Sequence, residues 1–450
     1  MTGLTLALTG FVLMLGGIFL RVPIALAMAL TGFFGTWYVL GTPNAPMAQM
    51  KTLTYETFSN QGLSIVPLFL LMGQFATRTG MSSALFRAAS DWLGHRKGGV
   101  AMASVGACAG FGAICGSSLA TASTMGQVAL PEMRKRGYSD ALSTGVLAAG
   151  GTLGILIPPS VILVIYAIMA EQNIVKMFMA AMVPGILAAL GYILTVAVYV
   201  RIRPDSATTA ERIPMRDRFK TFLATWPVIM IFGLTMGGIV GDWNWVKPGP
   251  QALFTPNEAA AFGATATALY GIVVGKLTLQ GFIQAILETA KATAMIFFIL
   301  LGAEILKGFL ALTRAPDMLA EWVLASNFAP ITVLVVMLIA YLVFGCVMDS
   351  LSMILLTIPI FLPVIEVLDF GMSAEDTAIW FGIIALIVVE VGLITPPVGM
   401  NLFIINGVAR DIPISRTYAG VAPFVLSDLI RVVILVSFPA ITLWLVGVMF

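Results

Sequence analysis

The sequence predicts an all-α polytopic membrane protein, built as an inverted repeat with two re-entrant helical hairpins and two Pro-Pro-broken helices. The composition gives the membrane class, because 59% of the 450 residues are hydrophobic and only 10% are charged. Soluble proteins usually carry about 25% charged residues. Two further observations give the architecture: two long uncharged segments with polar middles, and a Gly-x-x-x-Pro-Pro pattern that occurs twice.

Charge-poor segments bounded by polar turns give ten predicted spans. Most lysines and arginines then fall in turns on one side, which the positive-inside rule assigns to the cytoplasm, with both termini outside. The first span has no basic stretch before it and is expected to be retained, not removed as a signal peptide. The predicted spans are residues 4–20, 22–40, 61–77, 138–170, 177–200, 221–241, 259–275, 280–312, 377–406 and 418–448.

The first hairpin is predicted over residues 98–131, which carry no charge and lie between the basic clusters "HRK" and "RKR". A single helix of that length would be about 50 Å long, whereas the hydrocarbon core is about 30 Å thick. Because both flanks are basic, the segment is expected to enter from the cytoplasm and return there. Its tip is predicted within "AICGSSLATAS", residues 113–123.

The second hairpin is predicted over residues 330–365, with the middle "FGCVMDSLS". Because its C-terminal flank is acidic, this hairpin is expected to enter the membrane from the outside. Asp349 is the only charged residue between Glu321 and Glu366. A carboxylate within the membrane costs about 2.5–3.5 kcal/mol. It is expected either to bind a cation or to cap the return helix, and the two roles are compatible.

The Pro-Pro breaks lie in "GGTLGILIPPS" (150–160) and "VGLITPPVGMN" (391–401). A single such motif is typical of a kink packed by its neighbours. Here the order span, hairpin, broken span, span occurs twice, at residues 61–200 and 280–448, with opposite predicted orientations. Inverted repeats with broken helices are typical of secondary transporters.

Backbone freed at such breaks offers carbonyl oxygens to Na⁺ and helix N-termini to an anion. Hydroxyl, amide and carboxylate side chains near the tips and breaks are therefore candidate site residues. Glu390, just before the second break, is expected to have a helix-packing role, and three i,i+3 pairs (Glu288/Lys291, Glu304/Lys307, Asp428/Arg431) are expected to be ion pairs. The candidates are Gly116, Ser117, Ser118, Thr121, Ser123 and Thr124 at the first tip, Asp349, Ser350 and Ser352 at the second, and Ser160, Thr395, Gly399 and Asn401 at the breaks.

Other features point away from an enzyme or a metal cofactor. The single histidine, His95, lies in a basic flank, and the three cysteines lie in apolar segments without metal-ligand spacing. No Ser/His, Ser/Lys or paired-aspartate arrangement stands out, and nothing suggests nucleic-acid binding. Residues 81–97 form an amphipathic stretch expected to be an interfacial helix. Thr255 and Glu258 are expected to form a capping box.

The motifs "SIVPLFLLMGQFATRTGMS", "ICGSSLATAS", "GGTLGILIPPS", "TPNEAAA", "FGCVMDS" and "TPPVGMNLF" together resemble the large membrane subunit of tripartite ATP-independent periplasmic (TRAP) transporters. The resemblance implies a Na⁺-driven, elevator-type importer of an organic anion, a carboxylate or sugar acid, in the bacterial inner membrane. It also implies two separate partners, a small membrane subunit and a periplasmic substrate-binding protein, and no cofactor besides the coupling ion.

The same resemblance implies Na⁺ positions at the tips and breaks. The second tip reads "MDSLS", where many relatives carry proline or alanine after the aspartate. The implied positions are Gly116, Ser117, Ser118, Asp349, Gly392 and Thr395, with Gly154, Pro158 and Pro159 in the first break and Pro396 and Pro397 in the second.

The predicted organisation has scaffold spans in residues 1–60, the first repeat in 61–200, a cytoplasmic loop and scaffold spans in 201–279, and the second repeat in 280–450. The repeats would form the transport domain, with the 81–97 arm connecting it to the scaffold. The leading alternative is a stand-alone Na⁺/dicarboxylate symporter of the same architecture. An intramembrane enzyme is the remote one.

Overall fold

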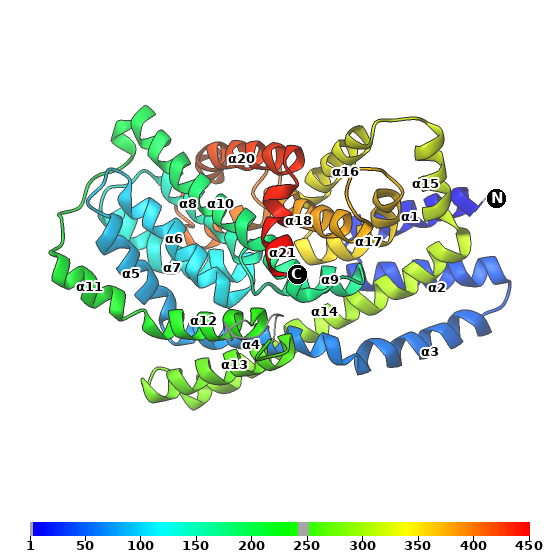
Figure 1. Cartoon of the computed structure of the whole chain (residues 1–450), viewed down its shortest axis with the longest axis horizontal. Helices are drawn as coiled ribbons and strands as arrows, with labels where there is room; N and C mark the ends of the chain where they lie inside the picture. Colours follow the sequence, from blue (N-terminus) through cyan, green and yellow to red (C-terminus); the bar gives the residue numbers. More distant parts are fainter. Residues whose placement is uncertain (1–2, 242–251) are drawn as a thin grey trace.

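The secondary structure is entirely helical in the part of the chain that the computed structural model describes, residues 3–241 and 252–450 (Figure 1). Within these ranges, three helices are long and apolar enough to cross a membrane, or five if each of two bent helix pairs counts as one span. Each of the ten predicted spans nevertheless coincides with a helix or a broken helix. Several are shorter than a full span, because prolines and glycines divide the apolar segments.

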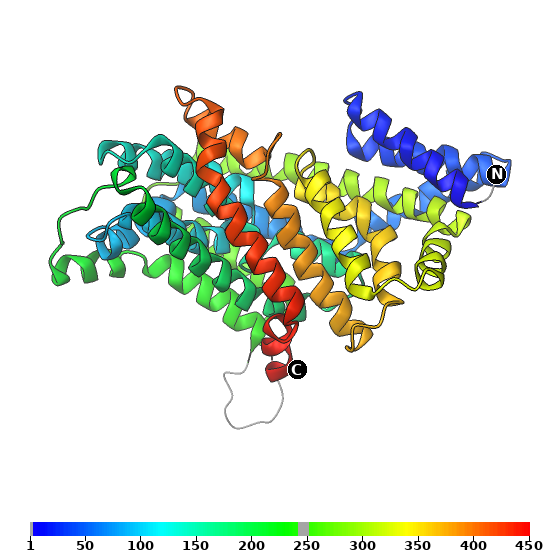
Figure 2. The same cartoon turned by 90° about the horizontal axis from the view of Figure 1, so that it is seen from above.

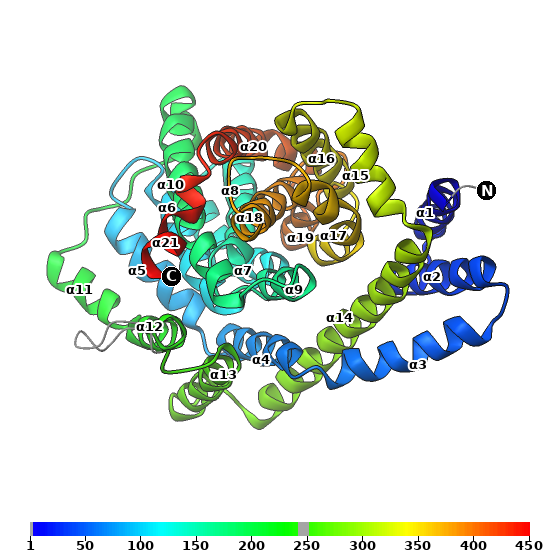
Figure 3. The same cartoon turned by 45° about the vertical axis from the view of Figure 1, so that its right-hand side comes forward.

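One group of helices forms an outer arc along the lower edge and the right-hand end of the molecule in Figures 1 and 3. The longest helix of this arc, α14, packs against α2, α3 and α4, and α13 packs against α4 and α12. Gly32 lets α2 approach the backbone of α14 near Ile305. The arc contains α1 (Gly3–Phe19), α2 (Ile24–Leu40), α3 (Asn44–Ser59), η1 (Gln61–Ser64), α4 (Ile65–Arg78), α12 (Trp226–Val240), α13 (Pro256–Val273) and α14 (Leu279–Thr313).

The first half of the remaining structure contains a hairpin and a broken helix. Helices α6 and α7 pack against each other and are joined only by Gly116 and Ser117, within the predicted tip. The helix axis bends by 46° between α8 and α9, at the Pro-Pro break. This half comprises α5 (Met81–Leu93), α6 (Gly99–Cys115), α7 (Ser118–Lys135), α8 (Asp140–Leu156), α9 (Val161–Met169) and α10 (Ile174–Ile202).

The second half repeats this order of elements. A hairpin of α16 and α17 is followed by a helix that stops before the second Pro-Pro pair and resumes after it, and then by α20, which runs obliquely across the molecule in Figure 2. This half comprises α15 (Ala315–Ala325), α16 (Pro330–Gly345), α17 (Ser350–Glu366), α18 (Ala374–Gly392), α19 (Met400–Val408), α20 (Ile414–Ser437) and α21 (Ala440–Met449).

The two halves interlock around a common core. Helix α8 of the first half packs along α20 of the second, where Gly145 and Gly420 allow close backbone contact, and α7 packs against α19. The Tyr166 hydroxyl donates a 2.6 Å hydrogen bond to the carbonyl oxygen of Ala378. The broken helices of both halves therefore lie inside one packed unit, and not on two separate domains.

Several local expectations are confirmed. Helix α5 begins at Met81 within the predicted amphipathic arm, the Thr255/Glu258 capping box is formed, and the three cysteines are free and buried. The chain also contains helices outside the predicted spans: α3, α15, α11 (Met215–Leu223) and the short η2 (Pro204–Ser206). The last predicted span is divided at Pro439, between α20 and α21.

One predicted ion pair is confirmed and two are wrong. Arg431 Nη2 lies 2.7 Å from Asp428 Oδ1. Glu288 instead pairs with Arg78 of α4, at 2.8 Å. Glu304 and Lys307 form no ion pair in the described structure. Spacing along one helix could not anticipate the Glu288 contact, because its partner lies on a neighbouring helix.

Candidate functional site

The tip of the first hairpin packs directly on the first break. Gly116 has a φ of +63°, and a Cβ added there would lie 3.0 Å from the carbonyl oxygen of Pro159. A Cβ on Gly112 would lie 2.5 Å from the Cα of Gly154. A Cβ on Gly154 would also lie 2.5 Å from Thr121 Oγ1. Glycine at these positions lets the two backbones touch.

Two helices begin beside each other at this contact. Ser117 caps α7 by accepting a hydrogen bond from the Ala120 amide, and Ser160 caps α9 by accepting one from the Leu163 amide, each over 3.4 Å. The Pro158–Pro159 peptide bond lies between α8 and α9 and is cis. The amide ends of two helices, which carry partial positive charge, are thus brought together inside the protein.

The second tip and break meet in a similar way. A Cβ on Gly392 would lie 2.6 Å from the Cα of Gly345, so these two glycines form a close contact equivalent to that of Gly112 and Gly154. The Gly399 amide donates to the carbonyl oxygen of Cys346 over 3.2 Å. The Cys346 thiol lies 3.5 Å from the carbonyl oxygen of Pro396, and the Pro396–Pro397 bond is also cis.

Asp349 caps the return helix of the second hairpin. Its Oδ2 accepts a hydrogen bond from the Ser352 amide over 3.0 Å, so the capping role expected for this carboxylate is confirmed. Thr395 Oγ1 donates a 2.6 Å hydrogen bond to the Val391 carbonyl oxygen, which leaves both lone pairs of the hydroxyl free. Both residues lie beside the second break, and a ligand role for either is compatible with these contacts.

Each hairpin tip packs against a Pro-Pro break, and these two places are called the tip-on-break contacts. Buried oxygen atoms without a hydrogen-bond partner lie around both of them. Buried polar atoms normally have a partner, and hydroxyl, amide and carboxylate oxygens are suitable ligands for a hard cation. Other unpartnered atoms lie elsewhere, including the Thr289 and Thr293 hydroxyls of α14 and two nitrogen atoms of Arg431. Those near the tips and breaks are Ser118 Oγ, Thr121 Oγ1, Ser352 Oγ, Asn401 Oδ1 and Glu390 Oε2.

Asn401 connects the second break to the first half. The side chain is fully buried, and its Nδ2 donates to the carbonyl oxygen of Ala148 in α8 over 3.3 Å. Its backbone amide donates to the Leu393 carbonyl oxygen over 3.1 Å, across the break. Asn401 of the second repeat therefore contacts α8, the helix that leads to the first break.

Glu390 was not among the predicted site residues. The side chain is 1% exposed, and its Oε1 accepts a 2.6 Å hydrogen bond from Ser350 Oγ, at the start of α17. The sequence contained a signal for it, because Glu390 stands two residues before Gly392 as Thr152 stands two residues before Gly154. Its contact with Ser350, 40 residues away along the chain, becomes visible only in the fold.

A buried polar chain starts at Thr152. Its hydroxyl lies 3.0 Å from the Tyr192 hydroxyl, which donates to Asp428 Oδ2 over 2.6 Å. Asp428 also pairs with Arg431. Removing one member of a buried ion pair leaves the other charge uncompensated. We therefore interpret this chain as structural support that joins α8, α10 and α20.

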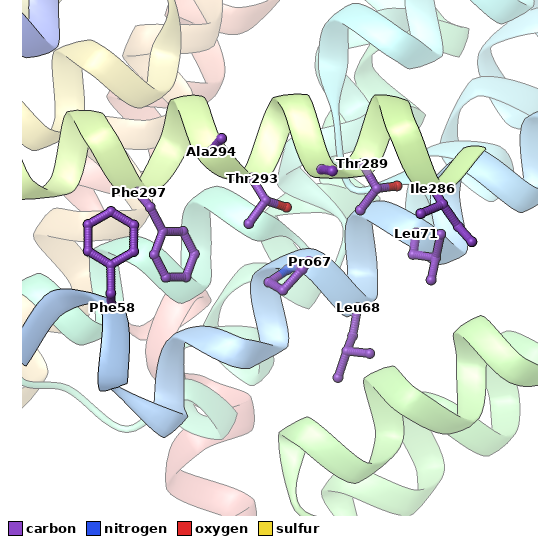
Figure 4. Close-up of a pocket in the computed structure, with 10 residues that line it drawn as sticks. Phe58, Pro67, Leu68, Leu71, Ile286, Thr289, Thr293, Ala294 and Phe297 are labelled. Carbon is purple, nitrogen blue, oxygen red and sulfur yellow. The ribbon is translucent and has the colours of Figure 1, made fainter. Parts of the chain in front are cut away.

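A separate pocket of about 470 Å³ lies between α4 and α14 (Figure 4). Its lining is mostly apolar and includes Phe58, Leu68 and Phe297, together with the hydroxyls of Thr289 and Thr293. None of the predicted site residues lines it. The pocket is therefore distinct from the tip-on-break contacts.

Comparison with known proteins places the chain in a family. The family model described as "Tripartite ATP-independent periplasmic transporter, DctM component" matches residues 11–441. The chain belongs to this family. It is a multi-pass membrane protein and a transporter permease, not an enzyme, which confirms the predicted resemblance and rules out the enzyme alternative.

Among its curated relatives is the C4-dicarboxylate TRAP transporter large permease protein DctM of Pseudomonas aeruginosa, 34% identical over 86% of this chain and 87% of that protein. The isethionate TRAP transporter permease protein DctMQ of Oleidesulfovibrio alaskensis is 30% identical over 95% of this chain and 64% of that protein. Among solved structures, the Alcanivorax borkumensis YdaH transporter superposes with a TM-score of 0.63 and 16% identity, covering 88% of each chain. That likeness supports the overall fold.

Proposed function

We propose that this DctM permease is a Na⁺-coupled secondary importer of a small organic anion, a carboxylate or sugar acid. The observation that carries the proposal is the pair of tip-on-break contacts. Each brings helix ends together with buried oxygen atoms that lack a hydrogen-bond partner. Such sites suit a small hard cation, and helix N-termini suit an anion. The relative named for C4-dicarboxylate agrees with a carboxylate substrate, and the one named for isethionate, a sulfonate, agrees with the broader class of small organic anions.

The site proposed for Na⁺ and substrate consists of the residues predicted from the tips and breaks. The first half contributes only neutral residues, whereas the second also contributes the carboxylate of Asp349. The proposed residues are Gly116, Ser117, Ser118, Thr121, Gly154, Pro158 and Pro159 from the first half, and Asp349, Ser350, Ser352, Gly392, Thr395, Pro396, Pro397 and Asn401 from the second.

We infer an elevator mechanism in which two inverted repeats carry the site across the membrane as one block. The interlocked packing of α7 and α8 with α19 and α20 supports a single moving unit. We assign α4 and α14 to the stationary frame, although they lie within the predicted repeat ranges, because they pack with α2 and α13 in the outer arc. Helix α5 would then be the arm between frame and moving block.

Two partners complete the proposed system: a small membrane subunit and a periplasmic binding protein that delivers the anion. The tripartite family description supports this composition. The proposed location is the bacterial inner membrane, with both termini in the periplasm. Most basic residues then fall in cytoplasmic turns, as the positive-inside rule requires.

The test is uptake of radiolabelled organic acids into proteoliposomes that contain the permease and its small subunit. An inward Na⁺ gradient together with the binding protein is expected to drive accumulation, and replacing Na⁺ with K⁺ is expected to abolish it. Accumulation without any Na⁺ gradient would contradict the coupling. Efficient Na⁺-driven uptake without the binding protein would favour the stand-alone Na⁺/dicarboxylate symporter instead.

A further inference from the structure

A long groove runs between α10 and α20, one helix from each half. Its volume is about 860 Å³, and its lining extends along α10 from Leu187 to Arg203 and along α20 from Ala419 to Ile434. A helix rises about 24 Å between Leu187 and Arg203, so the groove follows much of the hydrocarbon core, which is about 30 Å thick. None of the tip and break residues lines it, and it shares no lining residue with the pocket in Figure 4.

The walls of the groove are apolar and lie on the outside of the protein. Leu194 is 65% exposed and Leu426 is 60% exposed, and both lie in helices that are long and apolar enough to cross a membrane. Asp428 and Arg431 also line the groove, but they are paired with each other and only 1% and 5% exposed. An occupant must therefore be apolar over most of its length, as a lipid acyl chain is.

One end of the groove carries an uncompensated positive charge. The Arg203 guanidinium lies 5.5 Å from the centre of the Tyr199 ring, and its Nη1 donates to the Tyr199 hydroxyl over 3.4 Å. Both residues line the groove. Neither Arg203 nor the neighbouring Arg201 takes part in an ion pair of the described residues. Tyr199 thus holds a free guanidinium at the end of an apolar channel.

The surrounding segment has the same sign of charge. Residues 201–220 contain six basic and three acidic residues, a net charge of +3. The start of α20 lies at this end too, because the Ser139 amide donates to the Ser206 carbonyl oxygen and the adjacent Asp140 pairs with Arg416. In the proposed orientation this end faces the cytoplasm, where basic groups between membrane helices attract anionic headgroups.

We propose that this groove binds an anionic glycerophospholipid of the inner leaflet. Arg203 contacts the phosphate, since guanidinium and phosphate form strong charge-assisted hydrogen bonds, and one acyl chain lies between α10 and α20. The chain exchanges one hydrocarbon environment for another, so the headgroup contacts select the lipid. The choice of leaflet rests on the proposed orientation, whereas the binding is independent of Na⁺ coupling. The lipid joins the two halves beside the bond between Tyr192 and Asp428.

The experiment compares two lipids that differ only in headgroup. The permease with its small subunit is reconstituted in vesicles of equal parts phosphatidylglycerol and phosphatidylethanolamine, extracted, and weighed by native mass spectrometry. We expect phosphatidylglycerol to be enriched about tenfold among the bound lipids. Arg203→Gln should reduce this to about twofold or less, and Arg203→Lys should keep part of it. Arg21→Gln, at an exposed position between α1 and α2, is the matched control and should keep it all.

A second measurement locates the bound lipid. Phosphatidylglycerol with a diazirine in its acyl chain should label peptides of α10 and α20 that line the groove. Leu194→Trp fills the groove and should lose this label. Leu13→Trp makes the same change at a 70% exposed position on α1, outside the groove, and should retain the label.

Equal binding of the two lipids by the wild type, or a label confined to other helices, would overturn the proposal. Unchanged enrichment in a folded Arg203→Gln variant would do so as well. A label present in the isolated permease and absent from the complex would show that the small subunit covers the groove, which also contradicts lipid binding there. If the variants do not fold, as judged by size-exclusion chromatography, the lipid ratio and the label of the wild type decide.

Discussion

The two tip-on-break contacts share a backbone design but differ in burial and charge. In the first half, Pro158 and Pro159 are buried, and the nearby polar groups are hydroxyls. In the second half, Pro396 and Pro397 are exposed, and carboxylates stand at the cap of the return helix and before the break. Equivalent glycines close the backbone contact in both.

Because of this difference, the effect of the backbone geometry and the effect of the charged residues can be tested separately. The glycines set the close approach of tip and break, and both halves require them. The charges are particular to the second half, where Asp349 and Glu390 lie. Substitutions at equivalent positions should therefore have equal effects where they alter geometry and unequal effects where they alter charge.

The largest effect is expected from alanine at the contact glycines. In Gly154→Ala the new Cβ would lie 2.5 Å from Thr121 Oγ1, and in Gly392→Ala it would lie 2.6 Å from the Cα of Gly345. Overpacking of this kind costs about 1–3 kcal/mol. Both variants should lose most uptake and unfold at lower temperature, as measured by transport assay and thermal denaturation.

Matched controls exist in the helices next to these two glycines, α6 and α19. Gly106 in α6 and Gly407 in α19 have open space where a Cβ would be added. Alanine at either position should keep uptake, and the higher helix propensity of alanine favours the fold by about 0.5–1 kcal/mol. Equal losses in the controls and in the contact variants would show that the close approach is not what matters.

The next effect concerns Asp349, whose capping role can be separated from its charge. Asp349→Asn keeps a good N-cap, whereas Asp349→Ala removes the cap and costs about 0.5–2 kcal/mol. If Asp349 also binds Na⁺, the asparagine variant should retain its thermal stability and lose Na⁺-driven uptake. Ser117→Ala removes the equivalent cap of the first half, where the hydrogen bond is longer, at 3.4 Å. If the Asp349→Asn variant takes up substrate as the wild type does, the role of Asp349 is limited to capping.

A smaller effect is expected at Thr152, the neutral counterpart of Glu390. Thr152→Val removes the hydroxyl that lies 3.0 Å from the Tyr192 hydroxyl. Tyr192 keeps its bond to Asp428, so the loss of stability should be about 1 kcal/mol. Chemical denaturation should detect this change, while Na⁺ titration of uptake should match the wild type. A clear shift in the Na⁺ dependence of uptake would contradict the structural role of this hydroxyl.

The smallest effect is expected at an exposed ion pair that joins the halves. Arg134, near the end of α7, donates two 2.9 Å hydrogen bonds to Asp411, and these lower the pKa of the Asp411 carboxyl. A lowered pKa in the folded state gives stability that is present above the unfolded pKa and lost as the pH falls through the folded pKa. Asp411→Asn should therefore lower the stability slightly at neutral pH, since an exposed pair contributes little, and the difference between the two proteins should disappear as the pH falls through the folded pKa. Thermal denaturation across acid pH measures it, and identical profiles for the two proteins would contradict the assignment.

The breaks and tips could be predicted because local chemistry determines them. Proline pairs interrupt a helix wherever they occur, and Gly116 and Ser117 provide a turn and a cap within residues 113–123. The capping role of Asp349 followed from its place before a return helix. Each of these features depends on residues that are neighbours in the sequence.

Contacts between distant helices could not be predicted in this way. Glu390 meets Ser350 only because α17 and α18 pack together, and Glu288 meets Arg78 only because α4 lies beside α14. Helices α3 and α15 were not predicted because each is short and charged for an apolar span: α3 contains Lys51 and Glu56, and α15 contains Asp317 and Glu321. Packing between helices that are distant in the sequence therefore determines which charged residues lie at the site. The sequence alone does not identify the residues that they contact.

The most direct test of the central claim, that the tip-on-break contacts bind Na⁺, is the melting temperature of the purified permease in NaCl and in KCl at equal ionic strength. A ligand that binds only the folded state stabilises it by mass action. We predict that Na⁺ raises the melting temperature of the wild type and of the Gly106→Ala control, and that the rise disappears in a Ser118→Ala/Thr121→Ala double variant. The same rise in that variant and the wild type, or no rise in either, would contradict the account.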